Sequence, residues 1–156
     1  MTRLNKYNSL ILCSLVAFFI LLSDRVSKFI IVQSLRFGES LEVTSFFNIV
    51  RVENKGVTFG LLSGAAQPYV FAAVSLVVAA LLCVWAKKDK LIRLPASLII
   101  GGAIGNIVDR IINGAVIDFL DFHLLAYHWP AFNIADSAIV IGTAVLFFIS
   151  YGEERK

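Results

Sequence analysis

Short polar groups at helical spacing stand out against an apolar sequence. Asp24 precedes Lys28 by four residues, and Asn133 precedes Asp136 by three, so each group lies on one helix face. Asp118 belongs to a separate segment between them. Two carboxylates in one low-dielectric site cannot both ionise easily, so one keeps a proton while the other acts as a base. Asp118 and Asp136 therefore predict the acid–base chemistry of an aspartic peptidase, in which water attacks a peptide carbonyl.

A third polar group, formed by Asn106, Asp109 and Arg110, has the same helical spacing. Ionisable groups at membrane depth are costly and usually mark a site. The two groups that contain a basic residue are explained equally well as structural ion pairs that hold polar helix ends near the interface. Asp136 has no basic residue one helical turn away, so this structural explanation suits it less well.

Membrane-spanning helices must position these groups. The chain has 156 residues, of which 58% are apolar and 16% are charged, which is outside the range of soluble domains. Three of the apolar runs reach the length of about 20 residues needed for a span only if they include polar groups at one end. The length indicates a single integral-membrane domain, residues 1–156. The four predicted spans are Asn8 to about Val32, Pro68 to Ala86, Leu94 to Ile112, and Ile134 to Tyr151.

The first apolar run, Asn8 to Ser23, follows basic residues and could be a secretory signal sequence. No small-x-small cleavage site follows it. Instead Asp24, Arg25 and Lys28 are followed by more apolar sequence. We therefore interpret this run as a retained first span.

The basic residues predict the orientation of the spans. Eight of the 14 lie on one side, in the N-terminal segment, the connector from Lys87 to Arg93, and the C terminus. Lys and Arg are enriched in cytoplasmic loops, so both termini are expected in the cytoplasm. The polar groups then lie at the outer ends of their helices.

Two segments connect the spans at this outer end. The segment from Leu41 to Val52 is rich in β-branched and aromatic residues, which favours short strands. Strands with open edges cannot lie in lipid, so these are expected at the interface. The turn-forming pair Asn113-Gly114 should end the third span. We expect the following segment, Val116 to Leu120, to dip back and bring Asp118 beside Asp136.

Other chemistries have weaker support in the sequence. There is no H-E-x-x-H or G-x-S-x-G motif. His123, His128 and Asp121 could ligate a metal, but they are better explained as interfacial loop residues, so no metal or cofactor is expected. Cys13 and Cys83 lie in apolar runs and are expected to pack as small apolar side chains. The net charge is +3, but the basic residues form no continuous stripe, which argues against a nucleic-acid partner.

Five sequence blocks resemble, in order and spacing, the signature blocks of lipoprotein signal peptidases, the signal peptidase II family. The blocks are Asp24-Arg-Val-Ser-Lys28, Glu53-Asn-Lys-Gly-Val-Thr-Phe-Gly60, Gly101-Gly-Ala-Ile-Gly-Asn-Ile-Val-Asp-Arg110, Gly114-Ala-Val-Ile-Asp-Phe119 and Phe132-Asn-Ile-Ala-Asp-Ser137. Any one block is weak, but five in register over nearly the whole chain make the resemblance specific.

The resemblance implies an all-α membrane protein with four transmembrane helices, a small extracytoplasmic β-cradle and a short re-entrant half-helix. It implies an aspartic endopeptidase of the bacterial inner membrane that cuts prolipoproteins just before the diacylglyceryl-modified lipobox cysteine. By motif position Asp118 and Asp136 match the catalytic pair. The substrate-binding or supporting residues would be Asp24, Lys28, Asn54, Gly56, Asn106, Asp109, Arg110 and Asn133. The expected partners are prolipoproteins and membrane lipids, and the protein is expected to be a monomer.

Two other classes of protein are alternatives. A small transporter or proton-linked permease would also carry intramembrane acids, but it predicts charge spread across the bilayer and broken helices at its midplane. A non-catalytic assembly factor would use the polar groups only as structure. The convergence of so many polar groups at one face argues against both alternatives.

Overall fold

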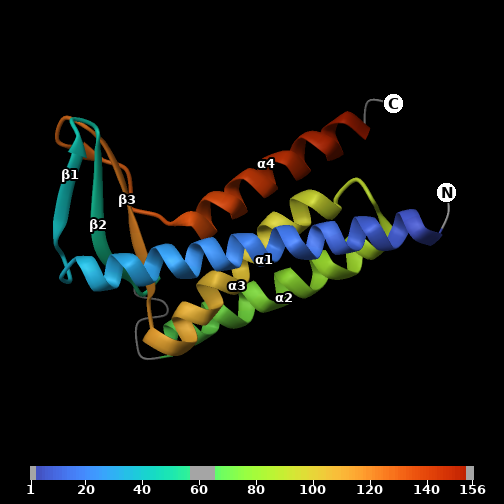
Figure 1. Cartoon of the computed structure of the whole chain (residues 1–156), viewed down its shortest axis with the longest axis horizontal. Helices are drawn as coiled ribbons and strands as arrows, with labels where there is room; N and C mark the ends of the chain where they lie inside the picture. The colour runs from blue at the N-terminus through green and yellow to red at the C-terminus, as the bar shows by residue number, and fades with distance from the viewer. Residues whose placement is uncertain (1–2, 57–65, 154–156) are drawn as a thin grey trace.

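Four long helices run side by side and a small sheet closes one end of the bundle (Figure 1). The computed structural model describes residues 3–56 and 66–153. Each helix is long and apolar enough to cross a membrane, so the four predicted spans are confirmed. α1 begins and α4 ends at the end of the molecule opposite the sheet. The helices are α1 Arg3–Ser34, α2 Gln67–Lys88, α3 Arg93–Asn113 and α4 Ile134–Glu153.

The helix ends beside the sheet are closed by specific hydrogen bonds. Gly114 follows α3 with a left-handed φ of 67°, and its N–H donates to the Arg110 carbonyl at 3.2 Å. The Asn-Gly turn predicted there is confirmed. The Arg51 side chain donates to the carbonyls of Val32 and Leu35 at 3.2 and 3.0 Å, near the end of α1. Carbonyls that lack a partner within the helix are thereby satisfied.

α3 lies at the centre of the bundle and packs against α1, α2 and α4. Glycines allow this close approach. A Cβ atom on Gly101 would lie 2.7 Å from the Ala17 carbonyl oxygen of α1, and one on Gly102 would collide with the Ala135 carbonyl of α4. Small residues let helix backbones approach closely where lipid gives no hydrophobic driving force. α1 and α2 make no close backbone contact with each other in the described chain, because α3 lies between them.

The sheet has four antiparallel strands in the order β1-β2-β3-β4. Strands were predicted within residues 41–52, and β1 and β2 confirm them. The segment 116–120, expected to dip back as a re-entering piece, instead begins β3. Its β-branched and aromatic residues pair with β2, which satisfies their backbone groups. The strands are β1 Ser40–Thr44, β2 Phe47–Asn54, β3 Val116–Leu124 and β4 Tyr127–His128.

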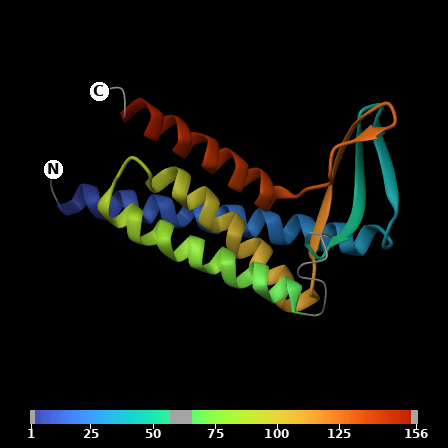
Figure 2. The ribbon, with the colours of Figure 1, turned by 180° about the vertical axis from the view of Figure 1, so that it is seen from behind.

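The sheet joins directly to the start of α4. Figure 2 shows the chain leaving the sheet and entering α4 beside the sheet edge. The Phe132 N–H donates to the Leu120 carbonyl at 3.1 Å, which fixes this junction to β3. A short half-helix is absent from residues 3–56 and 66–153. The segment 57–65, which contains the second half of the second sequence block, lies outside the described residues.

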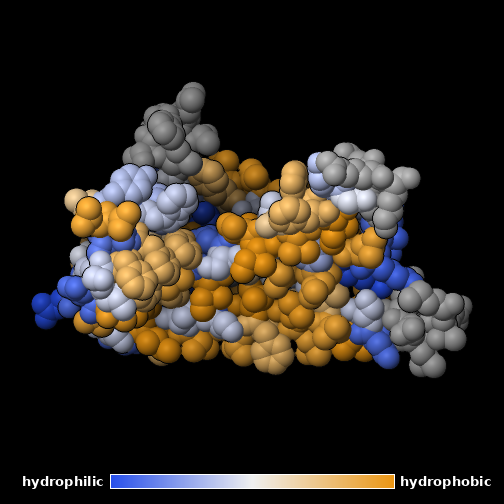
Figure 3. Space-filling model, turned by 90° about the horizontal axis from the view of Figure 1, so that it is seen from above, coloured by the Kyte–Doolittle hydropathy of each residue, from blue (hydrophilic) through white to orange (hydrophobic). Residues whose placement is uncertain are grey.

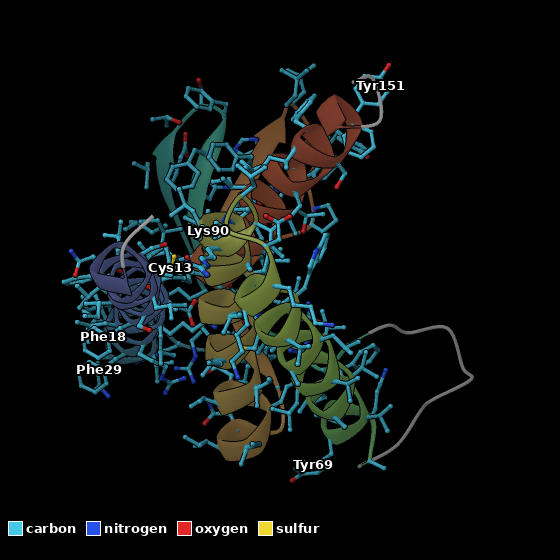
Figure 4. All side chains as sticks on the ribbon, turned by 90° about the vertical axis from the view of Figure 1, so that its right-hand side faces the viewer. Cys13, Phe18, Phe29, Tyr69, Lys90 and Tyr151 are labelled. Atoms are coloured by element: carbon cyan, nitrogen blue, oxygen red, sulfur yellow. The ribbon has the colours of Figure 1, made fainter. Side chains whose placement is uncertain are left out.

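The distribution of polarity is that of a membrane protein. Hydrophobic surface covers the middle of the molecule and hydrophilic residues gather at both ends (Figure 3). Phe18 and Phe29 point away from the bundle in Figure 4 and are 55% and 66% exposed. Asp24 and Lys28 are almost completely buried. Lipid tails can cover the apolar outer surface, whereas the charged groups are paired inside.

Candidate active site

Asp118 lies on β3 and is 2% exposed. Its Oδ1 accepts a hydrogen bond from the Asn133 side-chain amide at 2.7 Å, and its Oδ2 accepts one from the Asn54 amide at 2.9 Å. Burial raises the pKa of Asp118 to about 6; the Asn54 hydrogen bond opposes this rise, and the charge of Asp136 adds to it. Asp118 is thus a buried carboxyl that keeps its proton to a higher pH than an ordinary aspartate.

Asp136 lies in the first turn of α4, where the helix dipole favours a negative charge. Asn133 and Asp136 form a reciprocal cap at this helix end. The Asp136 N–H donates to Asn133 Oδ1 at 2.9 Å, and the Asn133 N–H donates to Asp136 Oδ2 at 3.3 Å. Because the Asn133 amide also donates to Asp118, this one residue holds both carboxylates. The two predicted catalytic residues are therefore neighbours.

Asn106 of α3 holds Asp136 from the other side. Its side-chain NH₂ donates to Asp136 Oδ1 at 2.7 Å. Its oxygen accepts hydrogen bonds from Lys28 Nζ at 3.0 Å and from the Asn133 amide at 3.3 Å. Since a lysine ammonium can only donate, Lys28 fixes which end of the Asn106 amide faces Asp136. Lys28 therefore acts on the site through Asn106.

Lys28 is the centre of a buried ion network. Its ammonium lies 2.8 Å from a carboxylate oxygen of Asp24 and 2.8 Å from one of Asp109. Arg25 pairs with the other Asp109 oxygen. Two cations thus neutralise two carboxylates. The predicted Asp24–Lys28 ion pair is present, but Asp109 pairs with Lys28 and Arg25 rather than with its sequence neighbour Arg110.

The two carboxylates of this network also bind the backbone of the elements that carry Asp118 and Asp136. Asp24 accepts a hydrogen bond from the Ala135 N–H at the start of α4, at 3.0 Å. Asp109 accepts one from the Ile117 N–H of β3, at 3.3 Å. Gly105 makes room for Asp24, because a Cβ atom there would lie 2.5 Å from the carboxylate. The network positions β3 and α4 relative to the bundle.

The Arg110 guanidinium lies near the carboxylate pair and has N–H donors that form no hydrogen bond within the described residues. Its guanidinium donates to the Asn106 carbonyl at 3.3 Å and lies over the Phe71 ring at 5.7 Å. Its Nε has no hydrogen-bond partner among the described residues. Arg110 also interacts electrostatically with Asp136 and Asp118.

Gly56 supports Asn54 from the end of β2. Its N–H donates to Asn54 Oδ1 at 2.9 Å, which leaves the NH₂ of Asn54 facing Asp118. Its φ of 109° strongly disfavours residues with a side chain, and a Cβ atom there would lie 2.5 Å from the Phe71 ring. The glycine at this position is therefore explained by backbone conformation and space.

Two hollows open on the two carboxylates. One, of about 420 Å³, is lined by residues at the end of β2, by Asp118 and by Pro130. The other, of about 290 Å³, is lined by Trp129 and Phe132, which precede α4, and by Asp136, Ser137, Val140 and Ile141 of α4. Asp118 thus borders a partly polar hollow, and Asp136 borders a largely apolar one.

Asp121 and the two histidines form a separate cluster on the sheet. His128 Nδ1 lies 2.9 Å from Asp121, Asn48 donates to Asp121 at 3.0 Å, and the two imidazole rings stack at 4.8 Å. Burial would raise the pKa of Asp121, but hydrogen bonds from His128 and Asn48 together hold it below its usual value. Residues 3–56 and 66–153 contain no group of three or more His, Cys, Asp or Glu arranged to hold a metal.

The titration of Asp118 gives a testable dependence of stability on pH. Its folded-state pKa of about 6 lies above the value of 3.8 for an unperturbed aspartate. The folded state therefore binds the proton more tightly, and stability is lost as the pH rises from about 4 to about 6, by roughly 3 kcal/mol. We expect Asp118→Asn to gain stability relative to the unmodified protein over this range, measured as thermal unfolding in detergent from pH 4 to pH 7.

The control for this experiment is Asp118→Ala, which also lacks the titrating group. Both variants should show the same pH trend relative to the unmodified protein, offset by a constant that reflects their different hydrogen bonds. A difference that stays flat between pH 4 and pH 7 would contradict the raised pKa.

The sequence analysis missed some residues of the site. Arg25 was treated only as a charge near the end of the first span, but it pairs with Asp109, 84 residues away in the chain, and so joins α1 to α3. No local spacing signals such a pair. The strand β3 was missed as well, although its run of β-branched and aromatic residues after the Asn-Gly turn is a strand signal.

Comparisons with known proteins agree with this geometry. The model of the family described as "Signal peptidase (SPase) II" matches residues 16–151. The "Lipoprotein signal peptidase" of Cupriavidus taiwanensis is 45% identical over 146 residues, which cover 90% of this chain and 82% of that protein. The protein of the same name from Paraburkholderia phymatum is 44% identical over 138 residues, which cover 85% of this chain and 83% of that protein.

A solved structure is also similar over most of its length. It is described as a bacterial membrane enzyme determined by the in meso method. Its sequence is 33% identical, it superposes with a TM-score of 0.81, and the match covers 91% of this chain and 88% of that one.

Proposed function

The chain belongs to the signal peptidase II family and removes signal peptides from prolipoproteins, and we propose that Asp118 and Asp136 are its catalytic pair. The observation that carries the proposal is that Asn133 donates hydrogen bonds to both carboxylates. Two carboxylates so arranged can share one proton, as an aspartic peptidase requires. Cleavage of a diacylglyceryl-modified prolipoprotein by Asp118→Asn and Asp136→Asn variants tests it.

The proposed reaction assigns different roles to the two aspartates. Asp118 is buried and its pKa is raised to about 6, so it holds the shared proton and donates it to the scissile carbonyl oxygen. Asp136, at the N-terminus of α4, is assigned the role of the base that takes a proton from the attacking water. The tetrahedral intermediate then collapses: Asp136 passes the proton taken from water to the leaving nitrogen, the C–N bond breaks, and a hydroxyl of the intermediate returns its proton to Asp118 as the new carbonyl forms.

The polar residues around the two carboxylates bind the substrate and position the carboxylates. We propose that Arg110 donates to a backbone carbonyl of the substrate through a terminal guanidinium nitrogen, while Asn54 and Asn106 orient the two carboxylates. A peptide carbonyl in a dry site must find a donor, because leaving it unpaired costs about 1–3 kcal/mol. Arg110 thus acts in binding and charge stabilisation rather than in proton transfer.

The location of the pair suits a lipid-modified substrate. The carboxylates lie where the helices meet the sheet, close to one end of the bundle. A prolipoprotein with a diacylglyceryl group on its lipobox cysteine would present the bond before that cysteine at such an interface. The apolar hollow along α4 offers contact for its signal helix or acyl chains. We propose cleavage just before the lipidated cysteine, by a monomer that uses no cofactor.

Family membership as a peptidase argues against the permease and the assembly factor. The buried carboxylates also give the permease no support. Within the described spans the buried Asp24 and Asp109 and the partly buried Asp136 gather at the sheet end, on α1, α3 and the start of α4, rather than along the whole depth of the bilayer.

The chain is a multi-pass membrane protein, and we propose that both of its termini are cytoplasmic. Single-cysteine variants on a background without Cys13 and Cys83 test this in intact cells with a membrane-impermeant thiol reagent. Glu39→Cys and Asn113→Cys should be labelled from outside, and Lys88→Cys only after the membrane is opened. Labelling of Lys88→Cys in intact cells, with Glu39→Cys protected, would invert the topology. The reason for the expected result is the cluster of basic residues at the Lys88 end.

A further inference from the structure

A groove lies at the end of the bundle opposite the carboxylate pair. α3 forms its floor, and α1 and α2, which do not touch each other in the described chain, form its walls. Figure 4 faces this end, and Cys13 points there from α1 toward α3. Its volume of about 260 Å³ is near the lower limit for ligand pockets, which suits part of one lipid chain. The lining residues used below are Leu10, Cys13, Lys87, Arg93 and Ile100.

Arg93 is a buried cation in this groove. It is 3% exposed, its Nε donates to the Ala86 carbonyl at 2.9 Å, and one terminal nitrogen donates to Ser9 Oγ at 3.3 Å. Both acceptors are neutral, and no carboxylate of the described residues forms an ion pair with Arg93. A buried charge without a counter-ion is costly. The guanidinium keeps further donors that these two bonds do not use.

The charge and polarity of the groove are complementary to one kind of membrane component. Lys87 at its rim is exposed and adds a second positive charge close to Arg93. Leu10, Ile100 and most of the other lining residues are apolar. In a bilayer, a groove between spanning helices is in contact with lipid, and basic pockets at the membrane boundary attract anionic headgroups. An anionic phospholipid supplies both the missing counter-ion and the apolar chain.

We propose that this groove binds an anionic phospholipid, with its phosphate at Arg93 and Lys87 and part of one acyl chain along α3. Arg93 also caps the end of α2 through the Ala86 carbonyl. That structural role accounts for the position of the side chain, but it leaves the positive charge without an anion. The lipid would join α1, α2 and α3 at a place where α1 and α2 have no direct contact.

The test compares lipids that differ only in headgroup charge. The first lipid bound to the purified protein in detergent is titrated by native mass spectrometry, with phosphatidylglycerol and phosphatidylcholine of identical chains. We expect the unmodified protein to prefer phosphatidylglycerol. Lys87→Gln should reduce this preference about fivefold, as expected for one basic residue near a phosphate. Lys88→Gln is the matched control, because Lys88 is equally exposed but does not line the groove, and it should keep the preference.

A second variant tests the apolar part without changing charge. Cys13→Phe should fill the groove and weaken the binding of both lipids. Four results would overturn the proposal. They are equal affinity of the unmodified protein for the two lipids, equal loss in Lys87→Gln and Lys88→Gln, undiminished lipid binding by Cys13→Phe, or the same protection from thermal unfolding by inorganic phosphate as by phosphatidylglycerol. Since Arg93→Gln can disturb α2 by removing its cap, the decision rests on the lysine pair and on Cys13→Phe.

Discussion

Replacement of either Asp118 or Asp136 by asparagine is expected to lower the rate of prolipoprotein cleavage by several orders of magnitude. Each variant keeps the shape of the side chain but removes either the acid or the base, and both are needed in the same step. The measurement is the rate of cleavage of a diacylglyceryl-modified prolipoprotein in detergent or lipid, with folding checked separately. The matched control is Asp121→Asn, a buried carboxylate on the same strand that pairs with His128 and should not be required for cleavage.

The double variant distinguishes a pair from two separate carboxylates. If Asp118 and Asp136 share one proton, Asp118→Asn/Asp136→Asn should be little worse than either single variant, because the first change already disables the unit. Independent structural roles would instead give losses that add in free energy. Additive losses would therefore contradict the pair. Substantial activity in either single variant would show that a catalytic residue is misassigned, and Asp109 would be tested next.

Replacement of Lys28 by methionine is expected to cost about 3–5 kcal/mol of stability, the range for breaking a buried ion pair by removing one partner. Lys28 is 2% exposed and neutralises Asp24 and Asp109, so its loss leaves two buried carboxylates with only Arg25. Methionine fills similar space, so the effect reports the charge rather than a cavity. Thermal unfolding in detergent measures it, and the exposed Lys88→Met is the matched control.

A compensating change separates charge balance from packing. Asp24→Asn in the Lys28→Met background restores equal numbers of positive and negative charges in the network, and it should recover part of the lost stability. The folded fraction of Lys28→Met should keep some cleavage activity, because Lys28 acts through Asn106 and transfers no proton. A double variant less stable than Lys28→Met would contradict the network. Complete loss of activity in well-folded Lys28→Met would show that Lys28 has a more direct role.

Much of the fold could be predicted because it follows from local rules. A helix rises about 1.5 Å per residue, so the length and polarity of each apolar run set the spans to within a few residues. The spacing of Asn133 and Asp136 likewise placed both at the start of one helix, where they cap it. The composition of residues 41–52 predicted strands. These features depend on residues close together in the chain.

The tertiary structure decided which of these elements meet. Asp118 reaches Asp136 because β3 pairs with β2 and because Asn133 bonds to both carboxylates, and this register depends on contacts between distant segments. The spacing in the sequence suggests an ion pair between Asp109 and its neighbour Arg110. Because α1 packs on α3, however, Asp109 forms its ion pairs with Lys28 and Arg25.

Sequence by itself thus determined the membrane spans, the candidate carboxylates and the family resemblance, because hydropathy, helical spacing and motif order are properties of the linear chain. Only the tertiary structure decided the partners of each charge and the groove around Arg93. A buried charge forms an ion pair with an opposite charge that the packing of the helices brings within about 4 Å. No pattern of neighbouring residues in the sequence specifies which opposite charge that is.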